Sequence, residues 1–301
     1  MDGIHKGIQK VGVVGFGIMG SGIAQICAQA GYETYVSEIE KKLIDQGLER
    51  IERFLEKSVE KKKISLDDKQ AAMGRIHGAS TMDHFNDCDL VIEAVNENME
   101  LKKKIFRALD TVCKEDAILA TNTSSLSVID IAKETKIPDR VAGVHFFNPV
   151  PLMKLVEIVK SIVTDDGVIE RCREFCVTIG KTPIIAKDSP GFILNYLQYP
   201  FRLNAIRMVE NGIASKEDID AAAKFGLGHP MGPLELQDMV GLDTTLSAVD
   251  DIYNMTKDPN FAPPMLMRKM VSAGWLGKKT GKGFYEYDEN GKKILTRELI
   301  R

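Results

Sequence analysis

The chain has 301 residues, of which 44% are hydrophobic, enough for one large domain or two of ordinary size. A formal net charge of -3 and a pI near 6.0 argue against a nucleic-acid-binding or membrane-surface protein. The longest apolar run is too short to span a membrane, and the five scattered cysteines lack the spacing of a metal site. The first residues show no signal or transit pattern, so we expect a reduced, cytoplasmic protein without a metal ion.

Short β-branched runs alternate with amphipathic charged segments in the first part of the chain. The runs predict strands at 11–14, 33–37, 90–95, 117–120, 141–146, 155–159 and 183–185. Helical periodicity lies between them at 19–31, 40–63, 99–113 and 126–135. This alternation is typical of a parallel sheet that helices cover on both faces.

After this alternation the β-branched runs stop and the pattern becomes helical. Pro190 is predicted to lie in the first turn of a long helix, because its fixed backbone angle suits that position, and Gly212 suits the end of the helix. Ser215 begins a capping-box-like pattern for a further helix. We therefore predict an α/β domain over residues 1–187 and an all-α domain over residues 188–301.

A glycine-rich turn follows the first predicted strand and leads into a helical run. In the GxGxxG pattern the first glycine makes the tight turn, and the second lets the backbone approach a pyrophosphate. The third lets the helix lie close to the strand, with its N-terminal N–H groups directed at the phosphates. The strand–turn–helix context therefore predicts a Rossmann-type dinucleotide-binding domain. The predicted cofactor residues of this turn are Gly15, Gly17, Ile18, Met19 and Gly20.

An acidic residue, Glu38, follows the second predicted strand, eighteen residues after Gly20. A carboxylate at this point can accept hydrogen bonds from both ribose hydroxyls and repels a 2′-phosphate. The sequence therefore predicts NAD as the cofactor, while Lys41 and Lys42 nearby keep NADP as the alternative.

A histidine and a glutamate occupy unusual places in two consecutive strands. His145 lies at the end of the run Val-Ala-Gly-Val-His, and Glu157 interrupts the apolar run Leu-Val-Glu-Ile-Val. A carboxylate in such a run is costly to bury unless it is paired, so we predict that His145 is its partner. A paired imidazole and carboxylate form a general base with a defined tautomer, which indicates proton-transfer chemistry.

With these motifs in place, the chain resembles the 3-hydroxyacyl-CoA dehydrogenase family, and the short-chain 3-hydroxybutyryl-CoA branch is the most similar. The resemblance covers nearly all of the chain. Its motifs, besides the glycine turn and the block around His145, are the segments 91–98, 121–126, 188–195, 231–238, 241–243 and 281–285. It implies NAD-dependent oxidation of an (S)-3-hydroxyacyl-CoA to the 3-ketoacyl-CoA and the reverse reduction. His145 is then the base, and Glu157 holds its far nitrogen.

The resemblance also implies catalytic and substrate-binding roles for Ser124, Asn148 and Asn195. The Ser124 hydroxyl can donate to the 3-oxygen, Asn148 can orient His145 or contact substrate, and Asn195 can reach the substrate from the helical domain. The alternatives are a serine that caps the helix beginning near Ser127, and asparagines bonded to turn backbone.

Further roles concern the two nucleotides. Glu97, Lys102 and Asn122 are predicted by the resemblance to face NAD, and the alternative for Glu97 is a charge at a helix N-terminus. Lys57 and Lys61 are predicted to bind the CoA phosphates, and the alternative is a solvated helix face. Two departures from the family pattern, Phe54 in place of a small polar residue and Tyr196 in place of a basic one, concern the CoA and acyl contacts.

Two other functions are open at this point. Gulonate 3-dehydrogenases of the same superfamily share the glycine turn and the His–Glu pair, although the segments 231–236 and 241–243 favour the acyl-CoA branch. A catalytically silent dinucleotide-binding protein would bind NADH without turnover. The family also implies a stand-alone enzyme of fatty-acid or butyrate metabolism.

We also predict a homodimer through the helical domain, because about 114 residues cannot cover all of its apolar side chains. The predicted contact helices are 192–209 and 231–253. The apolar residues expected at that contact are Phe201, Met208, Leu234, Leu242 and Leu246.

Overall fold

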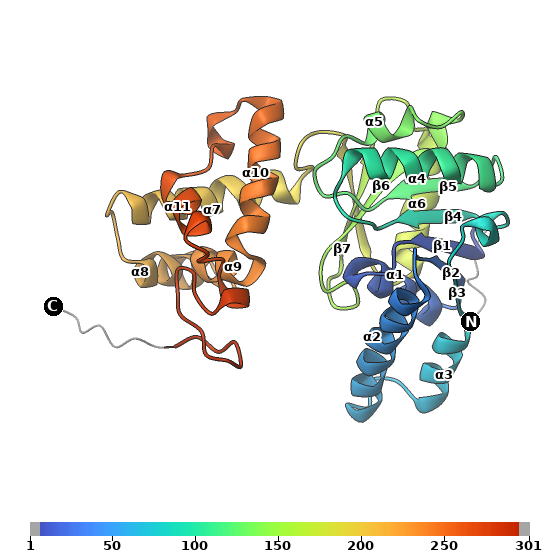
Figure 1. Cartoon of the computed structure of the whole chain (residues 1–301), viewed down its shortest axis with the longest axis horizontal. Coiled ribbons are helices and arrows are strands. Elements are labelled where there is room, and N and C mark those ends of the chain that lie inside the picture. The colour runs from blue at the N-terminus through green and yellow to red at the C-terminus, as the bar shows by residue number, and fades with distance from the viewer. Residues whose placement is uncertain (1–6, 295–301) are drawn as a thin grey trace. The chain divides into compact units, whose positions relative to one another are not determined.

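The computed structural model describes residues 7–294, which form two compact units that divide between Phe192 and Ile193 (Figure 1). The predicted domain boundary, between residues 187 and 188, thus lies five residues before the observed one. Asp188 shows why these residues belong to the first unit. Its carboxylate accepts hydrogen bonds from the backbone N–H groups of Val128 (3.0 Å) and Ile129 (2.8 Å), at the start of a helix of that unit.

The first unit is built on an eight-stranded sheet with the order β3-β2-β1-β4-β5-β6-β7-β8. The strands are β1 Lys10–Val14, β2 Glu33–Ser37, β3 Ile76–Ala79, β4 Leu90–Glu93, β5 Ile118–Thr121, β6 Val141–Phe146, β7 Leu155–Lys160 and β8 Thr182–Lys187. The helices are α1 Ile18–Gln29, α2 Lys41–Glu60, α3 Leu66–Gly74, α4 Met99–Val112, α5 Val128–Ala132 and α6 Asp166–Thr178. All seven predicted strands and all four predicted helices of this part are present, and the structure adds β3, α3 and α6.

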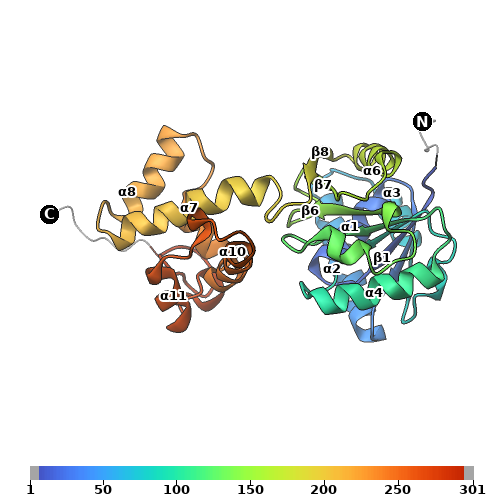
Figure 2. The ribbon, with the colours of Figure 1, turned by 90° about the horizontal axis from the view of Figure 1, so that it is seen from above.

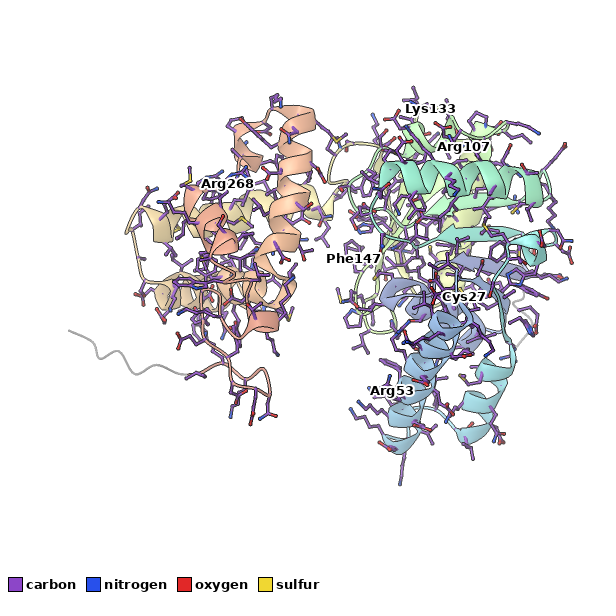
Figure 3. The ribbon with its side chains drawn as sticks, viewed as in Figure 1. Cys27, Arg53, Arg107, Lys133, Phe147 and Arg268 are labelled. Atoms are coloured by element: carbon purple, nitrogen blue, oxygen red, sulfur yellow. The ribbon has the colours of Figure 1, made fainter. Side chains whose placement is uncertain are left out.

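Helices cover both faces of the sheet, as predicted, with α4 and α5 on one face and α1 and α6 on the other (Figure 2). The central strands are buried along their whole length, which explains their continuous β-branched runs. In contrast, α2 and α3 extend away from the sheet (Figure 1). Cys27 of α1 lies in the interior, whereas Arg53 of α2 projects outward (Figure 3). All five cysteines are free and buried, as small core residues are.

The expected all-parallel sheet is wrong at one pair of strands. Each neighbouring pair is parallel except β6 and β7, which run antiparallel. Only residues 147–154 connect these two strands, too few for the helical crossover that a parallel connection needs. β3 escapes prediction because its sequence Ile-His-Gly-Ala contains a single β-branched residue, and it lies at the edge of the sheet.

The second unit is helical, as predicted. Its helices are α7 Leu194–Glu210, α8 Lys216–Ala221, a π-helical turn Ala222–Gly226, α9 Pro233–Val240, α10 Leu242–Thr256 and α11 Met265–Ser272. Their shared core includes Leu203, Ile206, Leu234, Leu242, Val249, Ile252, Phe261 and Met267. None of the helices in the described part of the chain is long and apolar enough to traverse a lipid bilayer.

The start of α7 differs from the prediction. Pro190 lies four residues before the helix, because Gly191 and Phe192 have positive φ angles of 81° and 48° that a right-handed helix cannot contain. Gly212, with φ of 64°, follows the end of α7 as predicted. The Ser215 hydroxyl accepts the N–H of Asp218 at 3.1 Å, which confirms the predicted cap.

Two of the apolar residues predicted at a contact between two copies of the chain are buried within one copy. Leu234 and Leu242 are fully buried in the core of the helical unit, so they cannot contribute to an apolar surface. Phe201, Met208 and Leu246 are partly buried. The homodimer stays a prediction that rests on other exposed apolar residues, namely Ile213, Phe225, Leu227, Met239, Met255 and Met265.

Candidate active site

The antiparallel pairing of β6 and β7 places His145 directly opposite Glu157. The imidazole Nδ1 lies 2.7 Å from the Glu157 Oε2, and the two residues are 3% and 0% exposed, so the predicted contact is present. Because the carboxylate holds Nδ1–H, Nε2 is the nitrogen that can exchange a proton. The rings of Phe147 and Phe192 lie 4.4 Å and 5.7 Å from the imidazole, centroid to centroid, and restrict its orientation.

The glycine turn has the close contacts that its pattern predicts. Gly15 has φ of 87°, and a Cβ atom there would lie 2.9 Å from the carbonyl oxygen of Ala94. A Cβ atom on Gly20 would lie 1.8 Å from the carbonyl oxygen of Gly15. At Gly17, by contrast, no atom of the described residues comes within 4 Å of that position. The turn therefore leaves room for a phosphate at the N-terminus of α1, as a dinucleotide requires.

A cavity of about 560 Å³ opens beside this turn, at the carboxyl ends of β1, β2 and β4. Ligands of open α/β sheets bind at this edge, where the strand order reverses. Gly15, Gly17 and Glu38 line the cavity together with the segments 80–82, 94–96 and 101–108 in part. The Glu38 carboxylate accepts hydrogen bonds from the N–H groups of Phe16 (2.9 Å) and Ile39 (2.8 Å), which hold it against the turn.

A buried ion-pair network lies next to the cavity. The Lys102 ammonium is 1% exposed and lies 2.7 Å from Glu93 Oε1 and 3.3 Å from Glu97 Oε2. Glu93 also accepts hydrogen bonds from the N–H of Val95 (2.7 Å) and the hydroxyl of Thr121 (2.8 Å). The structure thus places Lys102 against two carboxylates. Glu93 is a residue that the sequence prediction missed, although it carries the same signal as Glu157, a carboxylate inside an apolar strand.

Glu97 connects the loops that follow β4 and β5. Its Oε1 accepts hydrogen bonds from the Thr123 hydroxyl (2.5 Å) and the Ser124 N–H (2.8 Å). Burial by itself raises the pKa of the Glu97 carboxyl. The charge of Lys102 and these hydrogen bonds lower the pKa by more than burial raises it, so the pKa lies below its usual value. The N-cap of α4 is Asn98, whose side chain accepts the Leu101 N–H, so Glu97 does not serve as that cap.

Three more of the predicted residues lie in the loops that follow β5 and β6. Ser124 lies in the loop after β5, and it is Ser127 that caps α5. The Asn122 Oδ1 accepts the N–H of Phe146 at 2.8 Å, which ties that loop to the end of β6. Asn148 is exposed in the loop between β6 and β7.

Three other predicted residues lie on helices or directly after one. Lys57 and Lys61 are exposed in the last turn of α2 and directly after it. Asn195 belongs to α7 of the helical unit, where its Oδ1 accepts a hydrogen bond from the Gln198 amide at 2.8 Å.

Comparisons with known proteins agree with this arrangement. The family description "3-hydroxyacyl-CoA dehydrogenase, NAD binding domain" matches residues 10–189, and "3-hydroxyacyl-CoA dehydrogenase, C-terminal domain" matches residues 191–287. The chain belongs to the 3-hydroxyacyl-CoA dehydrogenase family. The predicted family, the oxidoreductase class and the NAD cofactor are thereby confirmed.

Relatives with this family's names match almost end to end. A 3-hydroxybutyryl-CoA dehydrogenase of Mycobacterium tuberculosis is 47% identical over 93% of this chain and 99% of its own length. One of Bradyrhizobium diazoefficiens is 43% identical over 96% of this chain and 99% of its own length. The crystal structure of (S)-3-hydroxybutyryl-CoA dehydrogenase from Ralstonia eutropha, 42% identical, has a TM-score of 0.92 and covers 94% of this chain and 100% of its own.

Proposed function

We propose that this dehydrogenase interconverts (S)-3-hydroxybutyryl-CoA and acetoacetyl-CoA, with His145 as the general base. The observation that carries the proposal is the buried 2.7 Å contact between the His145 Nδ1 and Glu157. The names of two relatives support the substrate, since the Mycobacterium tuberculosis and Bradyrhizobium diazoefficiens proteins, which match over nearly their full length, are named 3-hydroxybutyryl-CoA dehydrogenases. Such a reaction belongs to butyrate or fatty-acid metabolism.

When bound, NAD supplies the acceptor for the hydride that leaves the 3-carbon. The protein's own residues manage the proton. In oxidation, His145 Nε2 takes the proton of the 3-hydroxyl, and the carboxylate of Glu157 stabilises the imidazolium through Nδ1. In reduction, the same imidazolium returns that proton to the 3-oxygen. The Ser124 hydroxyl is the proposed donor to this oxygen, because the Glu97 carboxylate holds the Ser124 backbone in place.

Lys57 and Lys61 are the proposed contacts of the CoA phosphates. Lys57 lies in the last turn of α2 and Lys61 is the residue that caps its C-terminus, so the two are one turn apart, and both are exposed. Phe54, which is half-buried, lies one turn before Lys57. Replacing both lysines by glutamine is expected to raise the KM for acetoacetyl-CoA and leave the affinity for NADH unchanged.

The test compares acetoacetyl-CoA reduction by NADH with gulonate oxidation by NAD. We expect turnover of acetoacetyl-CoA, its loss in His145→Ala, and an unchanged dissociation constant for NADH. His77→Ala is the matched control, because His77 and Glu33 form a 2.7 Å contact that is exposed to solvent at the sheet edge. Turnover of gulonate alone would support the sugar-acid branch, and NADH binding without any turnover would support a silent protein.

A further inference from the structure

A buried lysine outside the candidate active site anchors the loop that connects β6 and β7. Lys181, directly before β8, is 8% exposed. Its ammonium donates hydrogen bonds to the carbonyl oxygens of Val150 (2.5 Å) and Met153 (2.8 Å). No carboxylate of the described residues forms an ion pair with it, and burial lowers the pKa of this ammonium. Burying a cation costs free energy, and both hydrogen bonds that offset this cost go to carbonyl groups of one loop.

This loop, residues 147–154, follows β6, which carries His145, and leads into β7, which carries Glu157. It also carries Asn148. Its far end is held by a hydrogen bond from the N–H of Thr182, next to Lys181, to the carbonyl oxygen of Lys154 at 2.7 Å. The position of Asn148 therefore depends on where residues 181 and 182 hold this loop.

The nucleotide-binding helix presses on the same loop. Gly22 of α1 packs against Val150 so closely that a Cβ atom on it would lie 2.8 Å from the Val150 Cβ and 3.5 Å from Pro151. Val150 is 2% exposed. The loop is thus held between α1 and Lys181, so the helix that begins at the glycine turn and the segment that bears Asn148 cannot shift independently.

We infer that Lys181 is a positioning residue of the dehydrogenase reaction, which holds Asn148 in the catalytic geometry through the Val150 and Met153 carbonyls. This inference rests on the proposed function. A lysine that only stabilised the fold would alter the unfolding midpoint but not the rate of each folded molecule. A positioning lysine alters that rate, because displacement of a catalytic group by about 1 Å can cost up to about 100-fold.

The test is Lys181→Met, which keeps the aliphatic stem and removes the ammonium. We expect kcat for acetoacetyl-CoA reduction to fall at least about tenfold while the dissociation constant for NADH stays within about twofold. Lys160→Met, at the end of β7, is the matched control, because Lys160 makes only a surface ion pair with Asp166. The same comparison is repeated in an Asn148→Ala background, where Lys181→Met is expected to cost little more.

A Lys181→Met variant with the kcat of the wild type, or with an undiminished loss in the Asn148→Ala background, would overturn the inference. If Lys181→Met does not fold, Gly22→Ala displaces the same loop from its other side and takes its place, with the same expected fall in kcat and the same reduced cost in the Asn148→Ala background. A wild type that does not turn over acetoacetyl-CoA would instead reject the proposed function, and the positioning role with it.

Discussion

The Glu157 carboxylate offers the sharpest test of the proposed base. Glu157→Gln is nearly isosteric and keeps an oxygen able to accept the Nδ1–H of His145, but removes the charge. The carboxylate lies 2.7 Å from that nitrogen, and the two residues are 0% and 3% exposed, so solvent screens the pair little. Unit charges about 4 Å apart attract by about 4 kcal/mol at an effective dielectric constant near 20.

This attraction exists only when the imidazole is charged, as it becomes when it takes the substrate proton. Since about 1.4 kcal/mol corresponds to a factor of ten in rate, the full loss would be close to 1000-fold. The amide retains part of the hydrogen bond, so we expect kcat for 3-hydroxybutyryl-CoA oxidation to fall roughly 100- to 1000-fold. An amide that turns its NH2 toward Nδ1 would favour the wrong tautomer and enlarge the loss.

The assay is steady-state formation of NADH at neutral pH, together with the dissociation constant for NADH and the thermal midpoint. Glu33→Gln is the matched control, because the exposed pair of Glu33 and His77 loses the same charge away from the proposed site. We expect that control to keep full activity. A Glu157→Gln enzyme whose kcat stays within about threefold of wild type would show that the Glu157 charge does not stabilise the imidazolium of His145.

Three further predictions concern the cofactor, acid stability and the helical core. Glu38→Ala is expected to weaken NAD binding and to reduce the preference for NAD over NADP, because the carboxylate no longer repels a 2′-phosphate. The measurement is the ratio of kcat/KM with NAD to kcat/KM with NADP, and an unchanged ratio would contradict this role of Glu38. The pKa of Glu97 is lowered in the folded state from its ordinary value of 4.5. The ionised carboxylate therefore stabilises the fold when the pH is above 4.5, and this contribution is lost as the pH falls through the lowered pKa. The difference in unfolding free energy between wild type and Glu97→Gln should therefore shrink on acidification in urea titrations, and a growing difference would contradict the assignment. Arg202 is 2% exposed, its pKa is lowered by burial to about 10, and both its Nε and the Gln237 Nε2 lack a hydrogen-bond partner among the described residues. Replacing both residues by leucine should raise the unfolding free energy by about 1–4 kcal/mol, and a lower urea midpoint would count against it.

Local signals predicted much of the fold and part of the site. The β-branched runs predicted seven of the eight strands, since strands buried on both faces need such side chains. The glycine turn predicted its close contacts, because no other residue could occupy the Gly15 and Gly20 positions. Glu157 predicted its own partner, because a buried carboxylate requires one.

Features that depend on distant segments escaped prediction. Glu93 carries the same signal as Glu157, yet its partner Lys102 lies on the exposed-looking pattern of α4, and only packing buries that ammonium. The start of α7 depends on the positive φ of Phe192, a conformation that its residue type does not suggest. Leu234 and Leu242 looked available for a second copy, but the other helices of the unit cover them completely.

The amino-acid order alone predicts the two classes of domain, the glycine turn and the pairing of His145 with Glu157, because each follows from local periodicity or from the cost of burying a charge. The reversed direction of β7 emerges only from the folded arrangement of the strands, and it sets His145 opposite Glu157 at 2.7 Å. The tertiary structure also brought Lys181 under the loop that connects them. Strand direction and loop anchoring depend on contacts between segments far apart in the chain, and no local pattern records them.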